Sequence, residues 1–485
     1  MKYDVIIIGG GVVGCAIARE LSRYQLDILL IEKEMDVGLG TSSRNSGVLH
    51  SGIHYKPGTI RAETDVKGNA MMAGLCKDLK VKYEYLGKLT VAQNADEVKT
   101  LHHLKEQGEA NGVPGLEIID SDKMQKLQPG VTGIKALHSP STGIISPYGL
   151  TIALAENAMT NGVEFSLGTE VTGIQKGQIG FTLTVAPRKT IQTRFIINAA
   201  GLFSAKVADM AGAGGYRIYP CRGEYYILDK RLKGALSILV YPVPGHGSSG
   251  LGIHLTNTVD GNILIGPSNE YIDEFQDLAT TAEVMRKLKK EGFELLPQLS
   301  QSDFIRTFSG LRPKQNPPEI GGFKDFVIES RKDVKGFINL VGIESPGLTA
   351  APAIALKVKD LLAELTSLNE KPDFTGERSG FTGHFCELPK EQRADMIARD
   401  PDYGEIICRC EQITKKEILD AIHNPLGARI LVGIKNRSRA MMGRCQGGFC
   451  MPRIVRILER EFGYSPEDYL LKSAESPLFS GWMRG

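Results

Sequence analysis

The stretch that decides the fold is residues 3–32, YDVIIIGGGVVGCAIARELSRYQLDILLIE. Residues 3–8 form an apolar run typical of a buried strand, residues 12–24 have helical spacing, and residues 27–31 again resemble a strand. This alternation predicts a βαβ unit, the building block of parallel sheets.

Three glycines lie between the first strand and the helix. Gly9, Gly11 and Gly14 have the spacing G-x-G-x-x-G, and Glu32 ends the next strand, 18 residues after Gly14. The glycines allow a tight turn, a close approach of backbone to pyrophosphate, and close packing of helix on strand. Glu32 suits the ribose hydroxyls and repels a 2′-phosphate, which argues against NADP. A dinucleotide site is predicted, with NAD and FAD both open.

Length and composition narrow the class of protein. A chain of 485 residues is expected to form two or three domains. Its 58 Lys and Arg against 56 Asp and Glu give a net charge of +2, so no global field favours nucleic acid. No run reaches 18 apolar residues, so we expect no membrane span and a cytoplasmic protein whose eight cysteines are thiols or metal ligands.

Four further segments carry a family resemblance: TSSRNSGVLHSGIHY at 41–55, IINAAG at 196–201, SGLRP at 309–313 and GIESPGLT at 342–349. They resemble segments of the D-amino-acid-oxidase-like superfamily, and within it the glycerol-3-phosphate dehydrogenases and oxidases and the L-2-hydroxyglutarate oxidases. The resemblance spans almost all of residues 1–365. It implies that the dinucleotide is FAD and that the chain is a flavin-dependent oxidoreductase.

The fingerprint and the resemblance together give the expected cofactor contacts. These are Gly9, Gly11, Val12, Val13, Gly14, Glu32, Lys33, Thr41, Ser42, Arg44, Asn45, Ser46, Gly47, Val171, Ala200, Gly201, Ser204, Gly310, Gly342, Gly347, Leu348 and Thr349. The segment 342–349 precedes a helix expected at 351–362, whose N-terminal amides can stabilise reduced, anionic flavin.

Histidines are the candidate bases for oxidation of an alcohol, because their pKa lies near neutrality. His50 occupies the position where the related glycerol-3-phosphate enzymes place a catalytic histidine, and His54 is a weaker candidate. His254 and Thr256 precede a turn at 260–262, so a hairpin would put both on one face of a strand. A packing role for these two is equally open.

Anion-binding residues are the candidates for holding the substrate. Arg312 can clamp a phosphate or carboxylate bidentately, and the resemblance assigns Arg312 and Ser345 to substrate binding. Ser46 and Thr256 complete the expected substrate contacts, and Arg312 joins His50 and His254 as a catalytic candidate. Possible additional cations are Lys56, Arg61 and Arg222, although each is more often a solvated surface charge.

Four cysteines near the C-terminus, Cys408, Cys410, Cys445 and Cys450, have the spacing C-x-C-x34-C-x4-C. They resemble the bacterioferritin-associated-ferredoxin-like domain, in which four thiolates hold a 2Fe-2S cluster. Zinc remains the alternative, but zinc sites favour C-x2-C pairs. The isolated cysteines are expected to be small buried residues: Cys15, Cys76, Cys221 and Cys386. The cations Lys435, Arg437, Arg439 and Arg444 are expected to raise the cluster potential, to form a docking patch or to be solvated.

The expected fold class is therefore α/β and α+β: a Rossmann-like FAD-binding domain with a β-sheet substrate domain, plus a small C-terminal iron-sulfur domain. FAD-binding segments are expected at about 1–80, 145–215 and 305–370, and the substrate domain at about 81–144 and 216–304. Residues 371–403, rich in Pro and Gly, are expected to be a linker, and 404–485 the 2Fe-2S domain.

The expected reaction is oxidation of glycerol 3-phosphate to dihydroxyacetone phosphate by hydride transfer to flavin. The resemblance implies that electrons leave through the cluster to a partner subunit. L-2-hydroxyglutarate, or another 2-hydroxy or amino acid, is the alternative substrate. A reading of another class is an electron-transfer subunit, whose flavin relays electrons while a partner binds the substrate.

Overall fold

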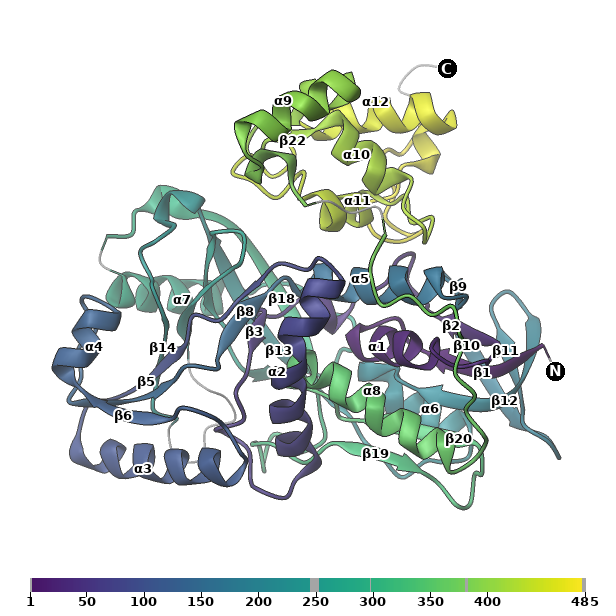
Figure 1. The fold of residues 1–485 in the computed structure, drawn as a ribbon, viewed down its shortest axis with the longest axis horizontal. Helices are drawn as coiled ribbons and strands as arrows, with labels where there is room; N and C mark the ends of the chain where they lie inside the picture. Colours follow the sequence, from purple (N-terminus) through teal and green to yellow (C-terminus); the bar gives the residue numbers. More distant parts are fainter. Residues whose placement is uncertain (1, 245–252, 297, 380–382, 482–485) are drawn as a thin grey trace.

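The computed structural model describes residues 2–244, 253–296, 298–379 and 383–481. Two sheet-based parts lie side by side, and a small helical part built from the C-terminal residues caps both (Figure 1). The predicted βαβ unit is confirmed: β1 is Tyr3–Ile8, α1 is Val12–Leu21 and β2 is Ile28–Ile31.

The first sheet has eight strands among the described residues, ordered β10-β11-β12-β1-β2-β9, with β20 beside β12 and β19 beside β20. Strands β1, β2, β9, β12 and β20 run parallel. Val5 and Ile7 of β1 enter one core and Ile6 and Ile8 the other, because successive side chains of a strand point to opposite faces. The remaining bounds are β9 Glu164–Ser166, β10 Val171–Lys176, β11 Phe181–Val185, β12 Lys189–Asn198, β19 Val327–Ser330 and β20 Phe337–Val341.

Helices cover both faces of this sheet. The core that contains Val5 and Ile7 also contains residues of α1, α2, α5 and α8. The opposite core includes Val207 and Ala208 of α6. The bounds are α2 Ile60–Asp78, α5 Pro147–Thr160, α6 Ser204–Met210 and α8 Gly347–Ala363, so α8 begins earlier than the helix expected at 351–362.

The second sheet has nine strands among the described residues, ordered β17-β13-β16-β15-β14-β5-β7-β6, with β18 also paired to β13. The expected hairpin forms between β15 and β16. Strand β18, Phe304–Lys314, pairs with β13 from Leu228 to Tyr219, so residues 305–314 belong to the substrate-side sheet and not to the first sheet. The other bounds are β5 Lys88–Ala92, β6 Glu117–Asp120, β7 Lys135–Ser139, β13 Tyr219–Leu228, β14 Leu239–Pro242, β15 His254–Asn257, β16 Ile263–Gly266 and β17 Glu270–Tyr271.

Smaller elements complete this body. Three short strands form a ribbon ordered β3-β8-β4, with bounds Val48–Leu49, Gly143–Ile145 and Tyr83–Glu84. The helices α3, α4 and α7 span Ala95–Ala110, Ser121–Leu127 and Ala282–Leu295. No helix among the described residues is long and apolar enough to span a membrane.

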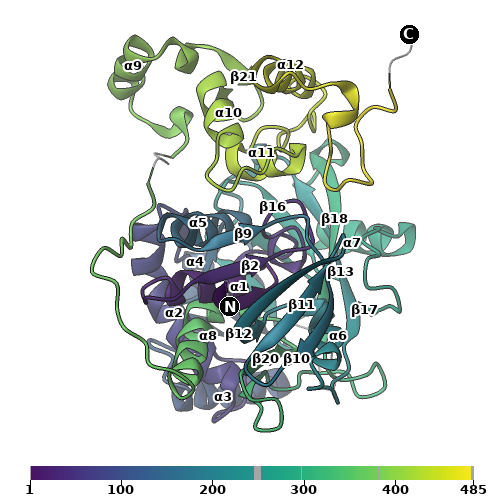
Figure 2. The same ribbon diagram turned by 90° about the vertical axis from the view of Figure 1, so that its right-hand side faces the viewer.

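The segment expected to be a linker is more structured than its composition suggests. Residues 375–377 lie along the first domain, where Asn157 Nδ2 donates to the carbonyls of Thr375 and Glu377 at 3.2 and 3.0 Å. Lys390–Arg399 then form α9. Figure 2 shows this segment running along one side of the molecule to the C-terminal part. The Pro and Gly composition of this segment does not report these side-chain contacts.

The C-terminal part is built around its own apolar core. Two short strands, β21 Ile406–Cys408 and β22 Ile413–Thr414, pack with α10 Lys415–Ile422, α11 Leu431–Ser438 and α12 Met451–Phe462. Thr414 and Glu417 form a capping box that fixes the start of α10. The turn after β21 and the loop before α12 carry the four cysteines.

Candidate active site and cluster site

The turn between β1 and α1 is a place where three backbone segments touch. Gly9 has φ +112°, and a Cβ there would lie 2.5 Å from the carbonyl oxygen of Ala199, at the end of β12. A Cβ at Gly14 would overlap the carbonyl oxygen of Gly9. The backbone amide of Val12 donates to Ser42 Oγ at 2.8 Å. Glycine is therefore required here by space, as the fingerprint predicts.

Glu32 is held against this turn by two hydrogen bonds. Its carboxylate accepts from the backbone N–H of Gly10 at 2.6 Å and of Glu34 at 2.9 Å. Burial raises the pKa of Glu32, and the two amides oppose that rise. The side chain therefore lies at the turn where the fingerprint predicts it, although it does not line the main cavity.

A cavity of about 990 Å³ lies between the two sheets, at the large end of the usual range for ligand pockets. Sixteen of the residues expected to bind cofactor or substrate line it: Gly11, Val12, Val13, Thr41, Ser42, Arg44, Asn45, Ser46, His50, Gly201, His254, Gly310, Arg312, Ser345, Gly347 and Leu348. The volume and the start of α8 at Gly347, which no side chain caps, fit an elongated cofactor with anionic groups.

Other expected contacts lie outside the cavity wall. They are Gly9, Gly14, Glu32, Lys33, Gly47, Val171, Ala200, Ser204, Thr256, Gly342 and Thr349. The side chain of Val171 is in the core on the far side of the first sheet. Thr349 acts behind the wall, because its hydroxyl accepts from the backbone N–H of His50 at 2.9 Å.

The loop of residues 41–47 is locked to strand β18. Thr41 Oγ1 donates to the carbonyl of Leu311 at 2.7 Å, and Arg44 Nη1 donates to that of Ser309 at 3.2 Å. A Cβ at Gly310 would overlap the carbonyl oxygen of Arg44, so only glycine allows this contact. The cofactor segment and the substrate-side sheet are thereby joined at the cavity.

His50 is held with its imidazole facing Ser345. The His50 Nε2 atom lies 3.2 Å from Ser345 Oγ, which in turn lies 3.4 Å from the hydroxyl of Tyr55. Burial, together with the charges of Lys88 and His254, lowers the pKa of His50 to about 3. The imidazole is therefore neutral at physiological pH and able to accept a proton.

A buried lysine behind His50 went unrecognised in the sequence. Lys88 is 1% exposed, and its Nζ lies 3.0 Å from His54 Nε2. Burial lowers the pKa of Lys88 to about 7, while the charge of Asp65 raises it. His54 thus faces Lys88. The one available signal was a lysine that opens an apolar strand.

Arg312 and Lys314 stand on the same face of β18, two residues apart. Both line the cavity. Arg312 donates to Asn269 Oδ1 at 3.0 Å and to the carbonyl of Ser268 at 3.1 Å, which fixes its guanidinium. Lys314 is 1% exposed and lies 3.4 Å from the carboxylate of Glu344. Because alternate residues of a strand share a face, the position of Arg312 could have identified Lys314 from the sequence.

Aromatic residues complete the wall and were also missed. Tyr225 and Tyr241 line the cavity. Tyr225 stacks on Phe308 of β18 with ring centroids 4.6 Å apart, and Tyr241 stacks on His254 at 3.8 Å. Only the pairing of distant strands places these rings at the cavity.

The additional cations proposed from the sequence do not line the cavity. Lys56 is exposed. Arg61 is buried against Glu344 at 3.3 Å. Arg222 binds three carboxylates, those of Glu224, Glu270 and Asp277. Arg61 and Arg222 are structural cations, not solvated ones, because each is desolvated and paired.

The four C-terminal cysteines converge as two pairs. Cys410 Sγ lies 3.7 Å from Cys445 Sγ, close to the ~3.8 Å expected for two sulfurs on one tetrahedral metal with bonds of about 2.3 Å. The thiols of Cys408 and Cys450 are hydrogen-bonded to each other. Among the described residues no three Cys, His, Asp or Glu side chains are grouped for one ion. Two thiolates on each of two metals fit this arrangement better than one zinc.

Backbone amides point at these sulfurs. The pKa of Cys408 is lowered to about 6, because the Cys450 thiol and the N–H groups of Glu411 and Met441 donate to it. The N–H groups of Phe449 and Gly447 lower the pKa of Cys445. Nearby non-glycine residues hold left-handed backbone: Gln412, Arg439, Met441 and Gln446. Such strain persists where the surroundings enforce it, as around an anionic centre.

The cysteines also differ in how far they are buried. Cys15, Cys76 and Cys221 are buried, as expected, whereas Cys386 is half-buried and its thiol lies 3.8 Å from the carbonyl of Glu411. Cys410 and Cys445 are exposed, while Cys408 and Cys450 are buried. One edge of the cluster site therefore faces solvent.

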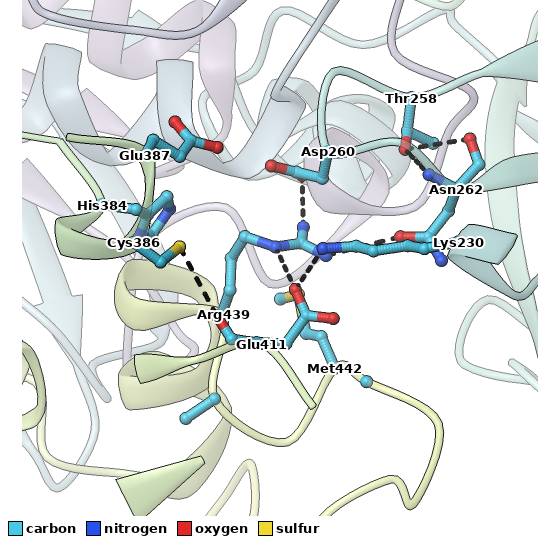
Figure 3. Close-up of polar contacts among 12 residues, drawn as sticks. Lys230, Thr258, Asp260, Asn262, His384, Cys386, Glu387, Glu411, Arg439 and Met442 are labelled. Atoms are coloured by element: carbon cyan, nitrogen blue, oxygen red, sulfur yellow. Dashed lines mark hydrogen bonds and ion pairs between the residues drawn. The ribbon is translucent and has the colours of Figure 1, made fainter. Parts of the chain in front are cut away.

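Arg439 ties the cluster-bearing part to the body of the protein (Figure 3). Its Nε donates to Glu411 Oε2 at 2.9 Å, and its Nη1 donates to the Tyr148 hydroxyl at 2.8 Å and to Asp260. Lys230 Nζ reaches the same Glu411 oxygen at 2.6 Å. Glu411 directly follows Cys410, so this network anchors a cluster-bearing turn.

Two more cations of the C-terminal part, Arg437 and Arg444, also face the body. Arg437 pairs with Asp36 of the first domain, with Nη2 to Oδ1 at 3.0 Å. Arg444 lies 3.3 Å from Asp229. These arginines are paired across the domain contact, and Arg437 and Arg439 are buried. The solvated patch that the sequence allowed is not found for them.

Comparison with known proteins defines the class. Residues 4–361 match the family of FAD dependent oxidoreductases, and residues 406–460 match the BFD-like [2Fe-2S] binding domain. The chain belongs to the FAD dependent oxidoreductase family and carries a C-terminal domain of the BFD-like type. Its cofactors are FAD and a 2Fe-2S cluster, which confirms the prediction from sequence.

Similar proteins narrow the type of FAD-dependent enzyme further. The chain is 42% identical over 463 residues to a glycerol 3-phosphate dehydrogenase of Caloramator mitchellensis, covering 95% of both chains. It is 30% identical over 399 residues to a mitochondrial L-2-hydroxyglutarate dehydrogenase of Arabidopsis thaliana, covering 73% of this chain and 82% of the relative. The structure of L-alpha-glycerophosphate oxidase from Mycoplasma pneumoniae with FAD bound matches with a TM-score of 0.72, at 30% identity over 78% of this chain and 98% of that one. The expected fold class is confirmed, and the chain is an FAD-dependent dehydrogenase of the glycerol-3-phosphate dehydrogenase type.

Proposed function

We propose that this protein oxidises glycerol 3-phosphate to dihydroxyacetone phosphate and passes the electrons through its 2Fe-2S cluster to a partner protein. The observation that carries the substrate choice is the pair Arg312 and Lys314, two cations on one face of β18 at the cavity wall. A phosphate dianion balances two such charges, because the carboxylate of Glu344 beside Lys314 is itself paired with the buried Arg61. A guanidinium also binds phosphate oxygens in a fork. The 42% identity to a glycerol 3-phosphate dehydrogenase supports the same choice.

In this proposal His50 takes the hydroxyl proton at Nε2. Bound FAD supplies the acceptor for the hydride. The proton acceptor must be neutral, and the lowered pKa of the buried imidazole meets that condition, although a pKa of about 3 makes it a weaker base than the near-neutral histidine expected from the sequence. Ser345 Oγ, 3.2 Å from Nε2, holds the ring in place, and the Tyr55 hydroxyl supports Ser345.

The route for electrons is supported by a second cavity, of about 210 Å³. Arg44, Asn45 and Ser46 line both this cavity and the large one. On its other side it is lined by Met442 and Gln446, the latter next to Cys445. The two cofactor sites are thus separated by a single short loop and this cavity. The exposed Cys410 and Cys445 offer the partner an accessible edge.

L-2-hydroxyglutarate is the second candidate, since relatives with that printed activity match 55–77% of the chain. Its two carboxylates would need two separate anion sites. Arg312 and Lys314 are adjacent on one strand, which favours one doubly charged group over two singly charged ones.

The test is anaerobic reduction of the purified holoprotein, followed at the flavin absorption band. Glycerol 3-phosphate is expected to bleach the flavin, and electron paramagnetic resonance should then detect a reduced cluster. Bleaching by L-2-hydroxyglutarate alone would overturn the substrate assignment. No bleaching by either compound would instead support the relay reading. A bleached flavin beside a permanently oxidised cluster would refute the proposed electron exit.

A variant at Arg312 tests the substrate assignment more specifically. Arg312→Leu removes a charged fork, so the KM for glycerol 3-phosphate should rise roughly tenfold to a hundredfold, as hydrogen bonds to charged groups are worth about 1.5–3 kcal/mol. Arg217→Leu, at an exposed arginine outside the cavity, is the matched control. Equal KM values for the two variants would contradict a phosphate site at Arg312.

A further inference from the structure

The 210 Å³ cavity at the domain contact is built from three separate parts of the fold. Arg44 comes from the loop after β2, Arg306 from β18, and Lys435 from α11 of the cluster-bearing domain. Lys472, from the segment after α12, closes the set. These four residues are referred to below as the cation cluster.

The cation cluster lacks carboxylate partners. None of its four members forms an ion pair within the part of the chain that the structure describes. Arg44 donates to the carbonyl of Ser309, and Arg306 Nη1 donates to Gln446 Oε1 at 2.9 Å, both neutral acceptors.

The nearest carboxylates already form ion pairs with cations outside this cluster. Asp260 lines the same cavity, but it is bound to Arg439. Glu34, whose charge is felt by Arg44 and Lys472, pairs with Lys33 at 3.4 Å. Positive charge therefore exceeds negative charge in a half-open cavity, in which Arg306 is exposed and Arg44, Lys435 and Lys472 are half-buried.

Such an excess is costly without an anion, because the cations repel one another and burial removes part of their screening by water. The pKa of Lys435 reflects this: burial, together with the charges of Arg306, Arg44 and Arg439, lowers it to about 7. Burial and the charges of Arg44 and Lys33 also lower the pKa of Lys472, against the opposing charge of Glu34. An oxyanion placed among the four would relieve the repulsion.

We propose that the cation cluster binds a small phosphate-bearing anion, either inorganic phosphate or a short phosphomonoester, in this second cavity, which adjoins the FAD and substrate cavity and shares Arg44 with it. Four cations from separate segments suit a dianion better than a monoanion. The cavity is smaller than the 300–1,000 Å³ typical of sites for drug-sized ligands, which excludes a nucleotide. Asn436 and the Tyr148 hydroxyl, also on the wall, supply polar surroundings.

Occupation of this site would affect both domains. Arg44 and Arg306 belong to the flavin-bearing body and Lys435 to the cluster-bearing domain, so a shared anion holds the contact together. It also lies between the two cofactor sites, where added negative charge lowers the potential of a nearby cluster.

Competitive labelling of the full-length holoprotein tests the proposal without any turnover. Acetic anhydride at neutral pH, in phosphate-free buffer, is expected to modify Lys435, and mass spectrometry gives the extent at each lysine. Inorganic phosphate should slow modification of Lys435 at least tenfold and leave the exposed Lys290 unchanged. A second arm with dihydroxyacetone phosphate distinguishes a phosphomonoester from the free ion. Absence of protection in both arms would overturn the proposal.

An Arg306→Gln variant supplies the matched comparison. Its concentration of phosphate for half-protection of Lys435 should rise roughly tenfold or more, given the worth of a hydrogen bond to a charged group. Lys472→Gln, at a residue on the rim, should raise it in the same direction, and Lys290→Gln should not. Protection of Lys435 that is unchanged in both cavity variants would place the phosphate elsewhere and refute the site.

Discussion

The flavin cavity and the cluster site recognise their cofactors in opposite ways. The cavity is assembled from segments as distant as Gly11 and Leu348, and much of its wall is backbone and apolar surface. The cluster site rests on four side chains from two short loops, Cys408 to Cys410 and Cys445 to Cys450. An organic cofactor is held by shape and many weak contacts, while a cluster is held by a few coordinate bonds.

This difference predicts which substitutions would disrupt each site. A metal site fails when one ligand is lost, and it fails without disturbing distant parts. A cofactor cavity tolerates the loss of single contacts but not of the backbone positions that bring its walls together. The four predictions below test that contrast, beginning with the largest effect.

Cys408→Ser should abolish the cluster while FAD stays bound. The buried Cys408 supplies one of four ligands, and its sulfur accepts hydrogen bonds from Cys450 and backbone amides. Iron and labile sulfide should fall to background, with the flavin-to-protein ratio unchanged. Cys386→Ser, at a neighbouring half-buried thiol, is the control and should keep its iron. Joint loss of FAD would show that the two sites are not independent.

His50→Gln should slow flavin reduction by glycerol 3-phosphate about 10²–10⁴-fold, the usual contribution of a positioned general base. Stopped-flow absorbance measures the rate, and the flavin content should be unchanged because the backbone N–H to Thr349 is retained. His138→Gln, at a half-buried histidine that is not part of the cavity wall, provides the control. A rate within threefold of the parent would remove His50 from the proton-accepting role.

Gly14→Ala should weaken the fold and FAD binding together, by about 3 kcal/mol or more, because overpacking against backbone finds no room to relax. The added Cβ would overlap the carbonyl oxygen of Gly9. Chemical denaturation and flavin content report the two losses. Gly40→Ala, where a Cβ meets nothing within 4 Å, should change stability by less than about 0.5 kcal/mol. Similar stability of the two variants would contradict the role of backbone contact.

Arg439→Met should loosen the domain contact by about 2 kcal/mol, the scale of hydrogen bonds to charged groups. The loss is limited because Glu411 keeps Lys230, and Asp260 keeps the Tyr148 hydroxyl at 3.1 Å. Hydrogen exchange in residues 404–450 should accelerate, with exchange in β1 unaltered. Lys416→Met, which breaks a surface pair with Asp420, should leave both unchanged. Equal exchange in the two variants would argue against Arg439 as an anchor.

Several features of the fold and of the two sites could be predicted from short segments of the sequence. The βαβ unit, its glycines and the four cysteines are defined by spacing within short segments, and the structure places them as that spacing predicts. Arg312 and His50 could be named because their segments resemble a family. Lys314 could have been found by its place two residues from Arg312, but Lys88, Tyr225 and Tyr241 could not, since their significance depends on strand pairing between residues far apart in the chain.

The sequence by itself determined that a dinucleotide turn opens the chain and that a thiolate site closes it. Tertiary structure alone decided that β18 belongs to the substrate-side sheet and that Arg61 and Arg222 are internal ion pairs. It also decided that the cations of the C-terminal domain face the flavin-bearing body. The physical reason is range: turns and coordinate bonds are set by neighbours along the chain, whereas burial and charge pairing depend on which distant surfaces meet.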